Sequence, residues 1–196
     1  MTDLLFKELY KKCLRFLGVR LRSEKEMRDK IATWIKKDSW AYDTRGSANL
    51  FEEVSEEAIS DDKTDIMNRV IEQLKKDRFV DDRRFAEEWV SSRMRSKPRG
   101  EFLLRMELAQ KGIDRFMIED VLEELLKGQT IEDSEENTVR AMALKVGLKS
   151  IRKLNGEDDR AFKFKMSQAL ARKGFESSTI KSVVDELLVT RYNTQD

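Results

Sequence analysis

An internal repeat with a spacing of 62 residues is the feature that most constrains the fold of this chain. Lys111-Gly112 ends one helical pattern and Lys173-Gly174 ends another, and the apolar residues around the two glycines coincide on superposition. The superposition pairs Leu108 with Leu170, Ala109 with Ala171, Ile118 with Ile180, Val121 with Val183 and Leu125 with Leu187. A weaker third copy lies upstream and contains Ile66, Val70, Ile71 and Leu74. Because no such unit can bury its apolar face alone, the repeat predicts a stacked helical array.

Helical periodicity and turn residues divide the chain into three units of three helices. One Pro and 8 Gly in 196 residues suit helices and argue against a turn-rich β-protein. Ser23 begins a capping box with Glu26, while Asp81 and Asp114 stand where further helices begin. We therefore expect an all-α protein with tandem three-helix repeats over residues 1–78, 79–128 and 129–196. The first repeat contains a long acidic insert at about 37–60.

Several classes of function are disfavoured by composition. The chain has no His, which is the commonest general base and metal ligand, and its one cysteine, Cys13, fits an apolar helical stripe. Acidic pairs such as Asp81-Asp82 and Asp158-Asp159 stand at helix starts, where capping explains them better than a magnesium site does. No apolar run approaches the roughly 20 residues of a membrane span, and no signal peptide is evident. We expect a cytoplasmic, monomeric protein that is not an enzyme and has no cofactor or metal.

Charge is nearly balanced overall but is unevenly distributed. Residues 91–116 hold seven basic and three acidic side chains, residues 140–173 hold ten and three, and residues 36–63 hold four and eight. A basic cluster is either a solvated face or a surface that contacts phosphates or an acidic protein. Phe102 and Phe162 have helical spacing and are expected in the core rather than as base-stacking platforms. The candidate partner- or DNA-binding residues are Arg83, Arg84, Arg93, Arg95, Lys97, Arg99, Arg105, Lys111, Arg160, Lys163, Lys165, Arg172 and Lys173.

Ordered strings in all three repeats resemble the RecX family of bacterial regulatory proteins. The first repeat contributes Leu14-Arg15-Phe16-Leu17 and Arg22-Ser23-Glu24-Lys25-Glu26-Met27. The second contributes Phe79-Val80-Asp81-Asp82-Arg83-Arg84-Phe85-Ala86 and Arg105-Met106-Glu107-Leu108-Ala109-Gln110-Lys111-Gly112-Ile113, and the third Leu170-Ala171-Arg172-Lys173-Gly174-Phe175. No single string is specific, but the ordered set is. The acidic insert is long for the family.

The resemblance implies a curved, elongated array that modulates the RecA recombinase. Such a protein binds the RecA–DNA filament, limits its extension or promotes its disassembly, and inhibits strand exchange and the associated ATP hydrolysis. The alternative is a helical repeat protein that binds DNA or RNA without sequence preference, since three-helix units can resemble helix-turn-helix modules. Recognition of a base sequence requires a helix that carries several Asn, Gln and Arg side chains, and none of the expected helices has such a set.

Overall fold

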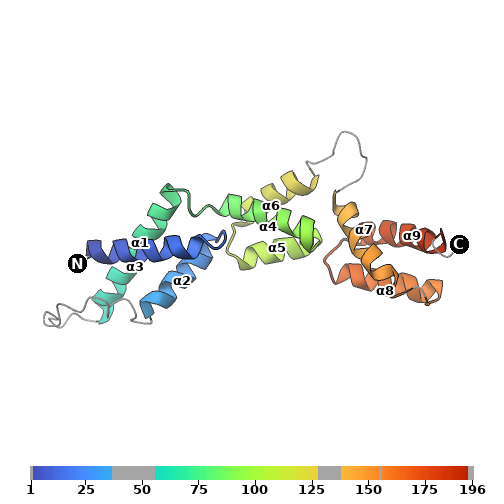
Figure 1. Cartoon of the computed structure of the whole chain (residues 1–196), viewed down its shortest axis with the longest axis horizontal. Helices are drawn as coiled ribbons and strands as arrows, with labels where there is room; N and C mark the ends of the chain where they lie inside the picture. The colour runs from blue at the N-terminus through green and yellow to red at the C-terminus, as the bar shows by residue number, and fades with distance from the viewer. Residues whose placement is uncertain (1, 37–55, 128–137, 155, 194–196) are drawn as a thin grey trace. The chain divides into compact units, whose positions relative to one another are not determined.

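A computed structural model describes residues 2–36, 56–127, 138–154 and 156–193. These residues form nine α-helices and one short π-helix, with no strand among them (Figure 1). The first repeat contains α1 (Thr2–Leu17), α2 (Glu24–Lys36) and α3 (Glu56–Lys76). The second contains α4 (Asp82–Ser96), α5 (Glu101–Gln110), α6 (Arg115–Leu122) and the π-helix η1 (Glu123–Lys127). The third contains α7 (Thr138–Ile151), α8 (Asp159–Ala171) and α9 (Ser177–Asn193), which confirms the predicted fold class.

Most of the predicted acidic insert, residues 37–55, lies outside the described residues. Its last part was predicted wrongly, because α3 begins at Glu56 rather than after residue 60.

The 62-residue repeat corresponds to a repeated helix ending. Gly112 and Gly174 have φ angles of 80° and 81°, which a glycine adopts without steric cost. After each glycine, a backbone N–H returns to the helix: Ile113 donates to the Leu108 carbonyl at 3.2 Å, and Phe175 donates to the Leu170 carbonyl at 3.4 Å. Both endings are therefore Schellman motifs, as the sequence predicts for Gly112. Arg78 ends α3 in the same way, at φ 59°, without the freedom of a glycine.

Aspartates cap the helices as expected. The carboxylate of Asp81 accepts from the Arg84 N–H at 3.0 Å, and that of Asp158 accepts from the Ala161 N–H at 2.7 Å. Asp114 accepts from the backbone N–H groups at the start of α6. Asp82 has a different role, because it accepts from the Glu24 N–H at 2.7 Å and so caps α2 from 58 residues away. Among the described residues, no group of three His, Cys, Asp or Glu could hold a metal ion.

The chain divides into two compact units, Met1–Phe85 and Ala86–Asp196. The first unit packs α1, α2 and α3 around Cys13, Met27, Ile31 and Val70, none of which is solvent-accessible. Cys13 is thus a core residue, as predicted. The repeat boundaries after residues 78 and 128 stay a prediction, as does the curved form.

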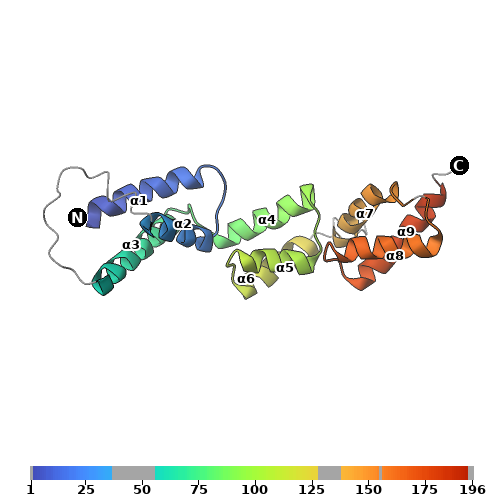
Figure 2. The same cartoon turned by 90° about the horizontal axis from the view of Figure 1, so that it is seen from below.

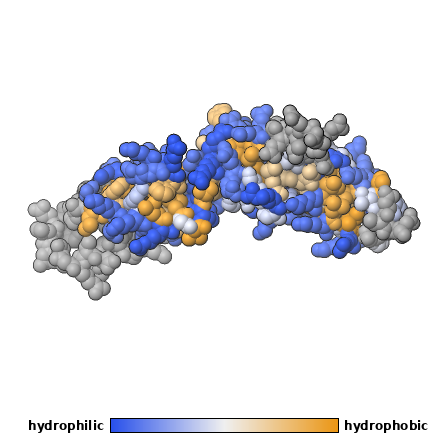
Figure 3. Space-filling view, turned by 45° about the horizontal axis from the view of Figure 1, so that its top comes forward, coloured by the Kyte–Doolittle hydropathy of each residue, from blue (hydrophilic) through white to orange (hydrophobic). Residues whose placement is uncertain are grey.

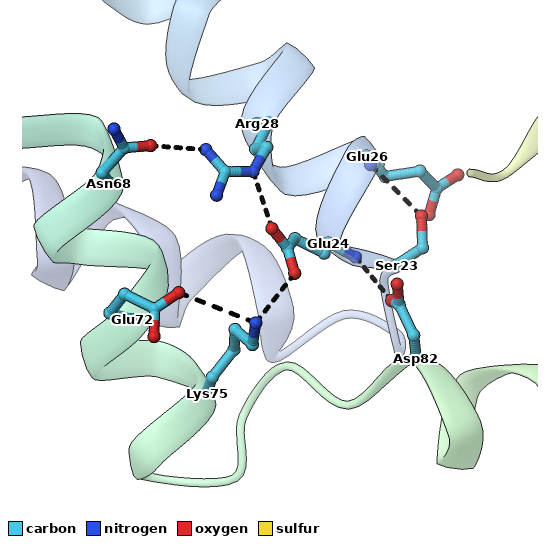
Figure 4. Close-up of polar contacts among 8 residues, drawn as sticks. All are labelled: Ser23, Glu24, Glu26, Arg28, Asn68, Glu72, Lys75 and Asp82. Atoms are coloured by element: carbon cyan, nitrogen blue, oxygen red, sulfur yellow. Dashed lines mark hydrogen bonds and ion pairs between the residues drawn. The ribbon is translucent and has the colours of Figure 1, made fainter. Parts of the chain in front are cut away.

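A polar network covers one edge of the first unit's core (Figure 4). The Glu24 carboxylate accepts from Arg28 at 2.7 Å and forms an ion pair with Lys75 at 3.2 Å. Burial alone would raise the pKa of Glu24, but these two cations outweigh it and hold the pKa below its ordinary value. Burial raises the pKa of Asp82. The network joins α2, α3 and the first turn of α4.

The second unit contains two helical bundles (Figure 2), and each has its own core. The first is centred on Val90, Leu104, Leu108, Val121 and Leu122, and the second on Phe162, Met166, Leu170, Val183 and Leu187. Phe162 is fully buried, as predicted, but the core position predicted for Phe102 is wrong, because this side chain is 61% exposed. Leu104 and Leu108 occupy the inward face of α5. Phe102 precedes Leu104 by two residues and therefore lies on the opposite face.

Two glycines hold the second and third repeats in contact. The Gly100 N–H donates to the Lys173 carbonyl at 2.8 Å. A Cβ atom added to Gly100 would lie 2.0 Å from the Gly174 carbonyl oxygen, and one added to Gly174 would lie 2.7 Å from the side chain of Leu103. Backbone therefore packs on backbone where these repeats meet.

Candidate functional site

The candidate site is the basic surface of the second unit. The described residues of the third repeat, 138–193, carry twelve Lys and Arg against six Asp and Glu. On the face seen in Figure 3, the surface of the molecule is largely hydrophilic and is interrupted by apolar patches. Some of these cations are paired with acidic neighbours, and others are available to a partner.

At the junction of α4 and α5, the Glu107 carboxylate lies beside two of the predicted site residues, Arg93 and Arg99. This carboxylate accepts from Arg93 Nε at 2.7 Å and from the indole N–H of Trp89 at 2.9 Å. Arg99 Nε lies 3.6 Å from the same carboxylate. Arg93 also stacks over the Trp89 ring at 4.5 Å, and Lys111 lies 5.2 Å from that ring. These cations therefore stabilise the second repeat through a shared anion and an aromatic ring.

Two further arginines of the predicted site are also paired. Arg105 donates to Glu119 at 2.7 and 2.9 Å and to Glu101 at 2.8 Å, linking α5 to α6. The hydrogen bonds to Glu119 raise the pKa of this guanidinium. Arg95 donates to Glu88 at 2.8 Å, but its side chain remains 65% exposed. An exposed ion pair of this kind is weak and can be exchanged for a partner's anion.

The rest of the predicted set is mostly exposed. In the third repeat, Lys163 pairs with Asp185 at 3.0 Å and Lys165 pairs with Glu157. Arg83 and Arg84 lie exposed on the first turn of α4, in the first unit. The side chains of four candidates contact no acidic group within the described parts of the chain: Lys97, Arg160, Arg172 and Lys173.

A basic stripe on α7 is absent from the sequence-derived set. Lys145 and Lys149 are exposed on α7 four residues apart, beside Leu144 and Leu148, and the exposed Arg152 follows directly after the last residue of the helix. These residues line a surface groove with a volume of about 590 Å³. The overall charge of residues 140–173 indicated a basic region, but only the helical spacing identifies this stripe, because residues three and four apart share a face.

One hydrogen bond places the α7 stripe beside the end of α4. Lys145 Nζ donates to the carbonyl oxygen of Arg95 at 3.0 Å. The cations at the end of α4 and those of α7 therefore belong to one region of the second unit. We call Arg95, Lys97, Lys145, Lys149 and Arg152 the α4–α7 basic surface.

Comparison with known proteins identifies relatives along almost the whole chain. Three RecX family models match it: the first three-helix domain over residues 10–34, the second over 81–122 and the third over 139–184. "Regulatory protein RecX" of Chlorobium phaeobacteroides is 33% identical over 187 residues, which cover 95% of this chain and 98% of that protein. The protein of the same name from Prosthecochloris aestuarii is 29% identical over 188 residues, covering 96% and 99%. A relative from Oceanobacillus iheyensis is longer, and the match covers 54% of it.

A solved structure shares the fold. The crystal structure of RecX from Lactobacillus salivarius superposes with a TM-score of 0.65 at 21% identity, covering 94% of this chain and 97% of that one. No helix among the described residues is both long and apolar enough to cross a membrane.

Proposed function

Because this chain belongs to the RecX family of regulatory proteins, we propose that it binds the RecA–DNA filament and inhibits strand exchange and the accompanying ATP hydrolysis. The observation that carries the proposal is the match of all three repeats, in order, to the three RecX domains. The family is regulatory, which agrees with a chain whose composition favours a binding surface over a catalytic site.

In this proposal the α4–α7 basic surface makes the main electrostatic contact. Lys145, Lys149 and Arg152 have no acidic partner among the described residues, so their binding to a partner would not require an existing ion pair to be broken. Lysines contact phosphates or carboxylates as point charges, while the arginines can bind them through two N–H groups at once. Such contacts weaken as salt rises and carry no base sequence information. Arg93, Arg99 and Arg105 have a structural role here, because they pair with Glu107 and Glu119 inside the second repeat.

The decisive measurement is DNA-dependent ATP hydrolysis by the cognate RecA at increasing amounts of this protein. Inhibition well below one protein per RecA monomer supports action on filaments. Loss of activity only when the DNA is saturated supports the second candidate, a DNA- or RNA-binding protein that merely competes for DNA. Unchanged hydrolysis at every ratio refutes both functions in this reaction.

The surface itself is tested by reversing two of its charges. We expect Arg95→Glu combined with Lys149→Glu to weaken inhibition at least tenfold while leaving helicity unchanged, since both side chains are exposed. Arg99 is unsuitable for this test, because its side chain is only 30% exposed and a glutamate there would be held against Glu107 away from solvent. The matched control is Lys7→Glu with Lys11→Glu, which makes the same charge change on two exposed side chains of α1. Equal effects of the two double variants would show that only net charge matters and would move the site away from the α4–α7 surface.

A further inference from the structure

Phe164 is an exposed aromatic residue in a groove of the third repeat. The side chain lies on α8 and is 67% exposed. The groove between α8 and α9 has a volume of about 660 Å³, and Ile180 and Val184 contribute apolar surface to it. Ser167 and Gln168 line the same groove with hydrogen-bonding groups. Together with Ile180 and Val184, the ring gives the groove an apolar surface that a ligand can cover.

Cations surround this ring. Lys181 of α9 lines the groove, and neither it nor Arg160 has an acidic partner among the residues the structure describes. Arg160 precedes Phe164 by four residues and therefore shares its face of α8, about 6 Å away along the helix. Lys163 also lines the groove, held by Asp185 at 3.0 Å. The groove thus combines an exposed aromatic face, polar groups and the available charge of Lys181, and Arg160 adds a second available charge next to it on α8.

The second repeat contains the same aromatic position without the same charges. Phe102 is related to Phe164 by the 62-residue repeat and is 61% exposed. The arginine on its helix, Arg105, is held by Glu119 and Glu101. The two repeats therefore offer similar rings but different electrostatic surroundings, which makes Phe102 a natural control for Phe164.

We propose that the α8–α9 groove binds single-stranded nucleic acid, with one base stacked on Phe164 and backbone phosphates contacted by Lys181 and Arg160. An aromatic platform flanked by cations is the arrangement that single strands require, because every unpaired base offers a π-face. In a duplex those faces are covered by neighbouring base pairs, so a double helix could use only the cations. The carboxylates of an acidic protein segment would use the cations but would leave the exposed Phe164 ring uncovered. This inference deepens the proposed function by giving its DNA component a site, but it can be tested without RecA.

The test measures binding of the full chain to a fluorescein-labelled oligothymidylate by fluorescence anisotropy. We expect Phe164→Ala to weaken binding about five- to tenfold, the lower part of the range for loss of one stacked base. Phe164→Trp should retain the affinity, and its added tryptophan fluorescence should be quenched by the oligonucleotide. Phe102→Ala should change the affinity less than twofold. Lys181→Ala should reduce the slope of log affinity against log salt by about 0.7, the loss of one phosphate contact on a single strand.

Two results would overturn the inference. The first is wild-type oligonucleotide affinity for Phe164→Ala, and the second is an equal loss for Phe164→Ala and Phe102→Ala. The first result together with lost inhibition of RecA would make the groove a protein-binding surface and leave the proposed function standing. Conversely, Phe164-dependent oligonucleotide binding by a wild-type protein that never inhibits RecA would refute the proposed function and support this site.

Discussion

Replacing Gly100 with alanine should separate the second and third repeats. The added Cβ would lie 2.0 Å from the Gly174 oxygen, 2.2 Å from its carbonyl carbon and 2.4 Å from the Phe175 nitrogen. All three are backbone atoms, so no side-chain rotation can relieve the overlap, and the two backbones must part by about 1 Å or more. Parting also removes the hydrogen bond from Gly100 to the Lys173 carbonyl. Overpacking of this kind costs about 1–3 kcal/mol and the lost hydrogen bond about 1 kcal/mol, so we expect a loss of about 2–4 kcal/mol.

Gly156→Ala provides the matched control, because a Cβ atom there would meet nothing within 4 Å. Gly100 itself has φ −70° and ψ 162°, which alanine adopts without strain, so the expected loss comes only from the contact between repeats. Urea unfolding followed by circular dichroism gives the stability of both variants. Amide hydrogen exchange of residue 100 reports directly on the bond to Lys173. If Gly100→Ala unfolds at the same urea concentration as Gly156→Ala and keeps its amide protected, the proposed backbone contact is refuted.

Three further substitutions have expected outcomes. Arg78→Gly should stabilise the protein by about 0.5–1 kcal/mol, because φ 59° strains any residue with a Cβ; a lower thermal midpoint would contradict this. Burial raises the pKa of Cys13 from 9.0 to about 12, so as pH rises the unfolded chain loses the thiol proton before the folded chain does, and the free energy of unfolding falls above about pH 9. In urea titrations, Cys13→Ala should show a smaller fall in this free energy between pH 9 and 10 than the wild type. Glu107→Gln should destabilise the protein by about 1–2 kcal/mol, since Arg93 and Arg99 lose their anion, and should tighten oligonucleotide binding through the added positive charge. Weaker binding by this variant at full helicity would refute the electrostatic part of that expectation.

Local features of the fold could be predicted from the sequence because they depend on neighbouring residues. Gly112 ends α5, Asp114 begins α6 and Cys13 lies in the core, as expected from turn chemistry and helical spacing. Phe102 is apolar but does not lie in the core, because Leu104 and Leu108 occupy the inward side of α5. Their spacing of four residues fixes that side, and Phe102 is not on it.

The candidate site was less predictable because its electrostatics are tertiary. The position of Arg93 and Arg99 along the chain does not indicate an acidic partner, yet Glu107 approaches both from α5. Similarly, only the fold brings Lys145 to the end of α4, 50 residues earlier. Helix packing therefore decides which cations remain available to a partner. The periodicity of the sequence indicates only which residues share one face of a helix.

The register of the repeat has a consequence for how such arrays can grow. Position 100 of the second repeat corresponds to position 162 of the third, and these hold a glycine and a fully buried phenylalanine. The glycine of the second repeat leaves room at this position for the backbone of the third repeat. The third repeat has an aromatic ring of its own core at the same position. A further repeat therefore could not pack on the third repeat in the way that the third packs on the second. The contact between these repeats therefore has a direction: the second repeat provides the glycine, and the third provides the backbone of Lys173 and Gly174 that packs against it.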